Sequence, residues 1–273
     1  MVVEQVVPVF FLSDSTGISA ETMGNALLIQ FPDLIFARRL FPFITTVEEA
    51  QRVVAILDAA MDGPVTPLVF TTAAVDEIRA VLLTSRCPII DFFGLHMDQV
   101  EATLGVRGMH VAARLHGVGD IQRYNNRMAA IEFAIEHDDG QSLRALDKAE
   151  VILVAPSRCG KTPTTMYLAL QHGIFVANYP LVDEDFESVD LPRPLRKLRE
   201  RCFGMLTNPQ RLSQVRTERR AGSRYASLEQ CTHELRRAEA MFRLHKVPTI
   251  NSSASSVEEM STLILQQIKQ LKT

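Results

Sequence analysis

Residues 151–163 read VILVAPSRCGKTP, and this short segment holds the patterns of a strand, a loop and the start of a helix. The compact apolar run from Val151 to Val154 predicts a buried strand. Pro163 suits the first turn of a helix, which is predicted to run to His172 and to end at Gly173. This order of elements predicts the first unit of a parallel α/β domain.

The loop in this segment has the composition of a phosphate-binding loop. Gly160, Lys161 and Thr162 match the end of the GxxxxGK(S/T) pattern, in which backbone N–H groups surround phosphate oxygens and the lysine adds positive charge. Ala155 stands where the pattern has glycine, and Pro156 removes one N–H donor. The alternative interpretation is an ordinary strand–loop–helix with an exposed lysine. The predicted nucleotide-binding residues are Ala155, Pro156, Ser157, Arg158, Cys159, Gly160, Lys161 and Thr162, with the Thr162 hydroxyl as predicted magnesium ligand.

The chain before this segment alternates between strand and helix patterns. Runs of β-branched and aromatic residues predict strands at 6–12, 34–40, 65–70 and 88–93, and helical spacing predicts helices at 20–31, 47–61 and 75–83. Such alternation is typical of a parallel sheet covered on both faces. A further helical stripe, formed by Met128, Ile131 and Ile135, stops at the acidic turn 137–140, where we place a domain boundary.

The predicted fold is therefore α/β with two domains. An N-terminal parallel-sheet α/β domain spans residues 1–140, and a P-loop kinase-like α/β domain spans 141–273. In the second domain we expect a strand at 174–177 and loops with short helices over the Arg- and Pro-rich segment 191–224. Ser256 and Glu259 predict a capping box for a C-terminal helix. One apolar face of that helix would consist of Val257, Met260, Ile264 and Leu271.

The composition is that of an ordinary globular protein. The chain has 273 residues, 47% of them hydrophobic and 22% charged, which is enough for a substantial core. A net charge of −3 argues against general binding of nucleic acid or of a membrane. We expect a cytoplasmic protein, because no N-terminal signal pattern and no run of about 18 apolar residues is found. Neither disulfides nor structural zinc is expected, since the cysteines lie far apart: Cys87, Cys159, Cys202 and Cys231.

Three other segments carry candidate functional side chains. Ser13 to Gly17 follows the first predicted strand, so its hydroxyls could bind a phosphate or a phosphorylated side chain, or form an ordinary capped turn. Asp138 and Asp139 could orient a hydroxyl and a metal in phosphoryl transfer, although Asp-Asp-Gly also marks solvated turns. An arginine cluster could bind phosphates or belong to a surface helix. It consists of Arg211, Arg216, Arg219, Arg220 and Arg224.

Several of these segments together resemble one protein family, the bifunctional serine/threonine kinases and phosphorylases that regulate phosphoenolpyruvate synthase or pyruvate, phosphate dikinase. The similar segments are FLSDSTG at 11–17, HDDG at 137–140, SRCGKTP at 157–163, ANYPL at 177–181 and SRYAS at 223–227. They occur in the family's order and extend over essentially the whole chain. The chain departs from the family at Ala155-Pro156, where Gly-Val is usual.

The resemblance implies two opposing activities. In one, ADP is the donor for phosphorylation of a threonine on the target enzyme, which is thereby inactivated. In the other, inorganic phosphate removes that phosphoryl group as pyrophosphate. Carried over by position, the ADP site is residues 155–162, with Lys161 neutralising phosphate charge, Thr162 beside magnesium, and Asp138 and Asp139 as further catalytic candidates. A homodimer would also fit the family.

The resemblance favours phosphoenolpyruvate synthase as the target, because segments 204–212, 218–220 and 223–231 look more like the synthase-regulating branch. Three alternatives stay open. The same chemistry could act on pyruvate, phosphate dikinase. The loop could serve a nucleotide-sensing regulator without catalysis, or an ATP-dependent kinase of small molecules.

Overall fold

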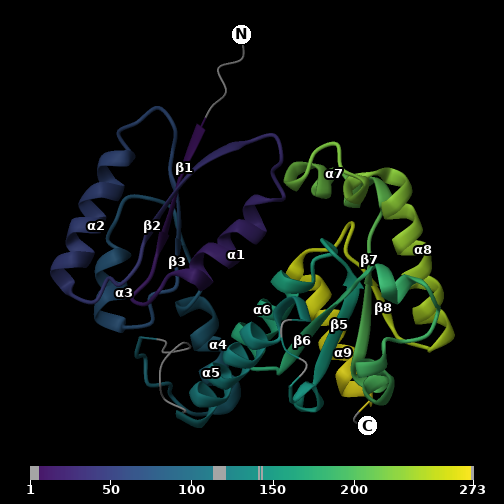
Figure 1. Cartoon of the computed structure of the whole chain (residues 1–273). Coiled ribbons are helices and arrows are strands. Elements are labelled where there is room, and N and C mark those ends of the chain that lie inside the picture. The colour runs from purple at the N-terminus through teal and green to yellow at the C-terminus, as the bar shows by residue number, and fades with distance from the viewer. Residues whose placement is uncertain (1–5, 113–120, 141, 143, 272–273) are drawn as a thin grey trace. The chain divides into compact units, whose positions relative to one another are not determined.

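The chain forms two compact units, Met1–Gly119 and Asp120–Thr273, each with its own sheet (Figure 1). The structure is a computed structural model, and it describes residues 6–112, 121–140, 142 and 144–271. Both sheets are four-stranded and parallel, as expected for an α/β protein. Within the described ranges, no helix is both long enough and apolar enough to cross a membrane.

The first unit alternates strands and helices, as its sequence pattern predicted. Its sheet has the order β2-β1-β3-β4. The elements are β1 (Val6–Leu12), α1 (Ile18–Leu28), β2 (Ile35–Phe41), α2 (Val47–Ala60), β3 (Leu68–Thr71), α3 (Asp76–Leu82), β4 (Ile89–Asp91) and α4 (Gly94–Leu104). Helix α4 was not predicted, because its sequence GLHMDQVEATL begins with glycine and has only one buried residue.

Helices cover both faces of this first sheet. Successive side chains of β1 point to opposite faces, so Phe11 packs with α1 on one face while Phe10 and Leu12 pack with α2 and α3 on the other. Figure 1 shows α1 on one side of the strands and α2 with α3 on the opposite side. The loops after the carboxyl ends of β1, β3 and β4 therefore meet at one edge of the sheet.

The second unit holds the predicted phosphate-binding loop, residues 155–162. Its sheet has the order β6-β5-β7-β8. The elements are α5 (Ile121–Glu136), β5 (Val151–Pro156), α6 (Lys161–His172), β6 (Val176–Leu181), β7 (Cys202–Leu206), α7 (Pro209–Arg219), α8 (Leu228–Leu244), β8 (Thr249–Asn251) and α9 (Val257–Leu271). Short 3₁₀ helices lie at Asp138–Gly140, Leu146–Lys148, Asp183–Phe186, Arg193–Arg201 and Arg224–Ala226.

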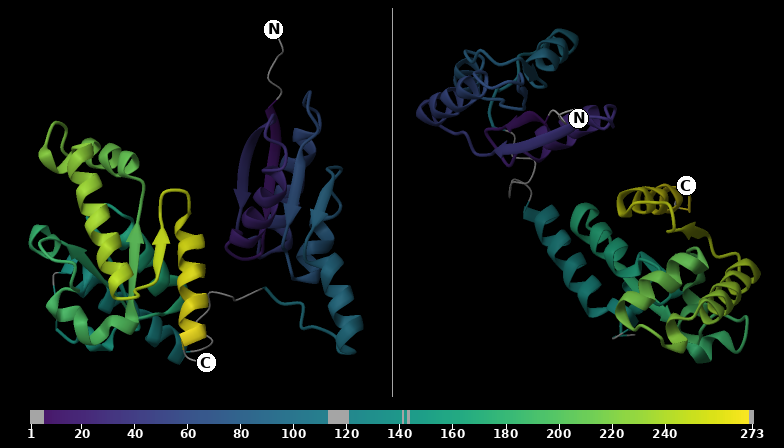
Figure 2. Two further views of the ribbon diagram at one scale, coloured as in Figure 1. Left: turned by 90° about the vertical axis from the view of Figure 1, so that its right-hand side faces the viewer. Right: turned by 90° about the horizontal axis from the view of Figure 1, so that it is seen from above.

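Helices also cover both faces of the second sheet (Figure 2). Leu153 of β5 points toward α6 and α9, whereas Ile152 and Val154 point toward α8. The capping box of α9 is formed as predicted, with Glu259 N–H donating to Ser256 Oγ at 3.2 Å. Of the predicted apolar face of α9, Met260 and Ile264 are buried, Val257 packs beside them, and the side chain of Leu271 lies outside the described residues.

Strand β7 differs most from the sequence prediction. The segment 191–224 was expected to hold loops and short helices, but it contains β7, which pairs with both β5 and β8. The strand is only five residues long and has Gly204 at its centre, so its apolar run is too short to stand out beside the arginines that flank it. Gly204 is required by the packing of α8, because an added Cβ would lie 2.5 Å from the ring of Phe242.

We expect Gly204→Ala to destabilise the second unit by about 1–3 kcal/mol, the usual cost of forcing a methyl group into a packed core. The measurement is the free energy of unfolding in urea. Arg236→Ala is the control, since Arg236 is an exposed residue of α8 in the same unit. Equal stabilities for the two variants would contradict the packing argument.

Helix α5 belongs to the second unit. Its residues Ala130 and Ala134 are buried against Ala169 of α6. The division between the units lies before α5, at residues 119–120, whereas the sequence pattern placed a boundary near residue 140. The acidic turn after α5 is joined to β6, because Asn178 N–H donates to the His137 carbonyl oxygen at 3.2 Å. That turn is therefore an internal connection of the second unit.

Candidate functional site

The loop between β5 and α6 leaves the carboxyl end of a fully buried strand. Its two left-handed residues are Arg158, with φ of 71°, and Gly160, with φ of 90°. Ala155 lies within β5, opposite Pro180 of β6, so the first position of the loop does not need the conformational freedom of glycine. The substitution of glycine by alanine at this position is therefore compatible with the loop.

The start of α6 presents uncapped backbone N–H groups. Its N-cap is Gly160, which has no side chain to accept a hydrogen bond, and the first helical residue is Lys161. Unpaired N–H groups at a helix N-terminus attract anions through direct hydrogen bonds and the helix dipole. A cavity of about 200 Å³ lies here. It is lined by Asp139, Ser157, Arg158, Gly160, Lys161, Thr162, Pro163, Val215 and Arg219.

Lys161 is a buried cation. It is 3% exposed, and its Nζ donates to the Pro156 carbonyl oxygen at 3.1 Å, across the loop. Burial of the ammonium group lowers the pKa of Lys161 from its ordinary value. Because Lys161 also lines the cavity, an anion bound there would supply the negative charge that favours the protonated lysine.

The acidic turn after α5 meets the start of α6. The Thr162 hydroxyl donates to Asp138 Oδ1 at 2.9 Å, and the Asn178 amide donates to the same oxygen. Asn178 also accepts from the Asp139 backbone N–H at 2.7 Å. Asn178 is 2% exposed and lies on β6, so it fixes the turn against the sheet. The predicted residues Asp138, Asp139 and Thr162 are thus brought together by a residue to which no role had been assigned.

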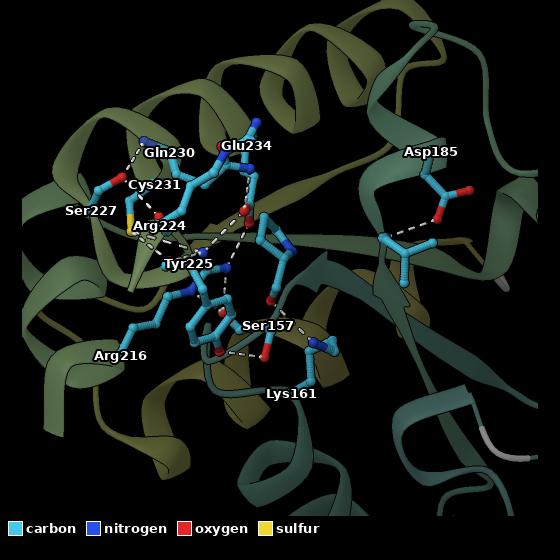
Figure 3. Close-up of polar contacts among 12 residues, drawn as sticks. Ser157, Lys161, Asp185, Arg216, Arg224, Tyr225, Ser227, Gln230, Cys231 and Glu234 are labelled. Carbon is cyan, nitrogen blue, oxygen red and sulfur yellow. Dashed lines mark hydrogen bonds and ion pairs between the residues drawn. The ribbon is translucent and has the colours of Figure 1, made fainter. Parts of the chain in front are cut away.

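A buried ion pair supports the loop from the other side (Figure 3). Arg216 of α7, 1% exposed, donates to both carboxylate oxygens of Glu234 on α8, at 3.1 and 2.6 Å. Its guanidinium also donates to the Ser157 carbonyl oxygen at 3.1 Å. The Tyr225 ring lies 4.2 Å from the guanidinium, and its hydroxyl is 2.9 Å from Ser157 Oγ. The shape of the loop at Ser157 therefore depends on α7 and α8.

The structure separates the predicted site residues into those at the cavity and those in the core. Ala155 and Cys159 are buried, and burial raises the pKa of the Cys159 thiol to about 12, so the thiol stays neutral. Within the predicted arginine cluster, Arg219 lines the cavity, whereas Arg216 is paired with Glu234 inside the protein. Three further residues of the site carry no recognisable motif of their own: Asn178, Tyr225 and Glu234. The first two lie in segments that carry the family resemblance.

The family model described as kinase/pyrophosphorylase matches residues 9–265, which include both the loop and the acidic turn. The chain belongs to the kinase/pyrophosphorylase family, and membership of this family implies kinase and phosphorylase activity. Among its relatives, a protein of Variovorax paradoxus is 47% identical over 264 residues, covering 96% of each chain. One of Cupriavidus necator is 43% identical over 261 residues, covering 95% of this chain and 97% of the relative.

Both of these relatives bear the name "Putative phosphoenolpyruvate synthase regulatory protein". A relative of Bordetella parapertussis with the same name is 42% identical over 261 residues, covering 95% of each chain. Among solved structures, a LacI transcriptional regulator from Lactobacillus brevis matches with a TM-score of 0.21 and 8% identity, over 90% of this chain and 98% of that chain. That likeness is too weak to support an argument.

Proposed function

We propose that the chain regulates phosphoenolpyruvate synthase by two opposing phosphoryl transfers. With ADP as donor it phosphorylates a threonine of the target and inactivates it, and with inorganic phosphate it removes the phosphoryl group and restores activity. The observation that carries the proposal is the joining of the phosphate-loop threonine, Thr162, to Asp138 at the edge of a cavity that Asp139 and Lys161 also line. Family membership and the names of the relatives support the same function.

In this proposal, the β5–α6 loop works as a P-loop and binds the diphosphate of ADP. The uncapped N–H groups of α6 and the Lys161 ammonium would contact phosphate oxygens. Arg219, the last residue of α7, also lines the cavity and could add a further contact. The kinase reaction forms a bond between the threonine oxygen and the β-phosphorus of ADP and breaks the bond from that phosphorus to the bridging oxygen. AMP leaves, and the threonine proton passes to a carboxylate.

The reverse activity needs no second nucleotide loop. An oxygen of inorganic phosphate would attack the phosphorus of phosphothreonine, the threonine oxygen would leave and take up a proton, and pyrophosphate would form. Both reactions place a phosphoryl group between two oxygens and develop negative charge around one phosphorus. A single cation at Lys161 would therefore stabilise both transition states.

The two aspartates receive different roles in this proposal. Asp138 Oδ1 already accepts hydrogen bonds from Thr162 and Asn178, so Asp138 would position the hydroxyl of Thr162. Asp139 lines the cavity, and its φ of 48° marks a turn held in place by Asn178. We assign Asp139 as the carboxylate that orients and deprotonates the hydroxyl of the target threonine.

The same residues fit a magnesium ion. Mg²⁺ takes hard oxygen ligands and usually keeps waters and substrate phosphates, and a carboxylate of Asp138 beside the hydroxyl of Thr162 provides such oxygens. When bound, the ion would neutralise charge on the transferred phosphoryl group.

We expect Asp139→Asn to lower kcat of the kinase about 100-fold, the scale for losing a positioned acid–base group, with much less change in ADP affinity. Asp138→Asn should lower the rate by about as much, because the carboxylate beside Thr162 loses its charge. The measurement is steady-state kinetics with ADP varied. Asp147→Asn is the control, since Asp147 is exposed in the same unit. Rates near wild type for both variants would mean that Asp138–Gly140 is only a turn.

The experiment that tests the proposed function supplies the protein with ADP or ATP and with each candidate target separately, and then maps phosphothreonine. Transfer from ADP to phosphoenolpyruvate synthase is expected. Modification of pyruvate, phosphate dikinase alone would mean that the dikinase, and not the synthase, is the target. Transfer from ATP alone would contradict the ADP assignment, and nucleotide binding without transfer to either target would indicate a non-catalytic regulator.

A further inference from the structure

The first unit has its own cavity, of about 200 Å³, far along the chain from the phosphate loop. Its polar lining comes from Ser13 to Gly17 after β1 and from Thr72 after β3, and its apolar wall from Met23, Phe92 and Phe93. In the order β2-β1-β3-β4, the chain leaves β1 and β3 for opposite faces of the sheet. Ligands of open α/β sheets bind at such a switch point, outside the carboxyl ends of the strands.

The start of α1 supplies donors to this cavity. Helix α1 has 11 residues, and its N-cap is Gly17, with φ of 81° and no side-chain hydrogen bond to the helix. The N–H groups of its first turn are therefore uncapped, and the helix dipole favours an acceptor or an anion in front of them. Thr16 and Ser19 add hydroxyl groups to the lining.

Asp14 indicates, independently of the helix N-terminus, that the cavity binds a ligand. Asp14 is one of the residues that line the cavity, and it is 4% exposed. Oδ2 accepts from the backbone N–H groups of Ala74 and Val75, at 2.7 and 2.9 Å. Oδ1 is buried and accepts no hydrogen bond from any residue that the structure describes. A buried acceptor without a donor is unfavourable, so the site is complete only when a ligand donates to Oδ1.

The ligand must satisfy both features at once. It needs acceptor oxygens for the N–H groups of α1 and a donor for Asp14 Oδ1, within a space that holds a small group. Among the residues that line this cavity none is Lys or Arg, so a fully deprotonated oxyanion would meet the charge of Asp14 without compensation. Inorganic phosphate near neutral pH still carries a P–OH group and combines acceptor oxygens with one donor.

We propose that this cavity is a binding site for inorganic phosphate in a protonated form, with its P–OH donating to Asp14 Oδ1 and its other oxygens accepting from the start of α1. The inference rests on the geometry of the first unit and holds whether or not the second unit is a kinase. The proposal predicts that the cavity distinguishes oxyanions by whether they carry a proton. Sulfate has no proton at neutral pH, and a phosphothreonine side chain loses its last one above a pKa of about 6.

The test is a titration of the full, ¹⁵N-labelled chain at pH 7.5, in which the backbone amides of Gly17 and Ser19 report on this cavity alone. With inorganic phosphate, both amides should shift saturably. With sulfate or a phosphothreonine peptide, binding should be weaker by about tenfold or more, because an O–H···O⁻ bond is replaced by two opposed unprotonated oxygens. Wild-type protein that shows no saturable shift, or equal affinities for phosphate and sulfate, would overturn the proposal.

Asp14→Asn separates ligand selection from the structural role of Asp14. The amide oxygen would keep the bonds from Ala74 and Val75, while the NH₂ group would replace Oδ1 and turn the acceptor into a donor. The preference for phosphate over sulfate should then disappear. Asp58→Asn is the matched control, since Asp58 also accepts a backbone N–H in the first unit, that of Arg86 at 2.8 Å, but lies outside the cavity. A preference unchanged in Asp14→Asn would contradict the assignment, and the wild-type comparison stands even if that variant does not fold.

Discussion

Lys161→Ala is expected to lower both the kinase and the pyrophosphate-forming rates by about 10³-fold, the upper range for removing one charged or hydrogen-bonding group that stabilises a transition state. The proposed mechanism holds the reacting phosphoryl groups of both reactions at the same loop, and Lys161 is one of the cations that line the cavity there, with Arg158 and Arg219. Lys161 is 3% exposed, so in the variant water could take the place of the ammonium group only if the surrounding residues rearranged. The measurement is kcat/KM for each direction, with ADP or inorganic phosphate varied.

The control for this variant is Lys148→Ala, because Lys148 is an exposed lysine of the same unit and does not line the loop cavity. The fold of Lys161→Ala should be retained, since the lost contact is one hydrogen bond to the Pro156 carbonyl oxygen. Far-UV circular dichroism and thermal unfolding check this point. If pyrophosphate formation continues at a normal rate while kinase activity is lost, the two reactions use different sites.

Glu234→Ala is expected to destabilise the second unit by about 3–5 kcal/mol, because it leaves the buried guanidinium of Arg216 without its carboxylate. Burial alone would lower the pKa of Arg216, but the hydrogen bond and the charge of Glu234 raise it. Removing Glu234 thus forces a cation to stay buried without a counter-ion. The measurement is the urea-unfolding free energy, with ADP binding measured alongside, since Arg216 also holds the Ser157 carbonyl oxygen.

The matched control is Glu239→Ala on the same helix. Glu239 pairs with Arg243 at 3.0 Å, with side chains 53% and 79% exposed, and such surface pairs contribute about 0.5 kcal/mol or less. Glu234→Gln should retain more stability than Glu234→Ala, because the amide oxygen still accepts from Arg216. Similar losses of stability for Glu234→Ala and Glu239→Ala would show that the buried pair is not what supports the loop.

The strands of the first unit and its helices α1, α2 and α3 could be predicted from the sequence, because runs of β-branched and aromatic residues alternate there with helical patterns. The same reasoning located β5 and the loop after it. It did not find β7, where Gly204 interrupts the five-residue run, since the need for glycine comes from Phe242 of a distant helix. The requirement is tertiary, and no local pattern expresses it.

The candidate site could likewise be predicted only in part from the sequence. Lys161 and Thr162 follow a local motif, and Asp138 and Asp139 were recognisable by residue type. What joins them is Asn178, whose role depends on the pairing of β5 with β6. Arg216 shows the opposite case: its charge suggested a phosphate ligand, but its partner, Glu234, lies on another helix and was not singled out. Burial and pairing of an arginine are set by packing, which periodicity alone does not reveal.

The attachment of Ser157 to α7 and its neighbouring turn makes the phosphate loop a product of long-range folding. Its two anchors, Arg216 and Tyr225, lie 59 and 68 residues further along the chain. Contacts of such separation form only after the intervening chain has closed into place, so an isolated strand–loop–helix of residues 151–172 would lack the loop shape that we propose binds an anion. In native-state hydrogen exchange, the hydrogen-bonded amides of α7 should lose protection together with those of α8, as one cooperative unit, because Arg216 and Glu234 join the two helices. Competence to bind nucleotide would then appear late in refolding, at the same rate as the docking of α8.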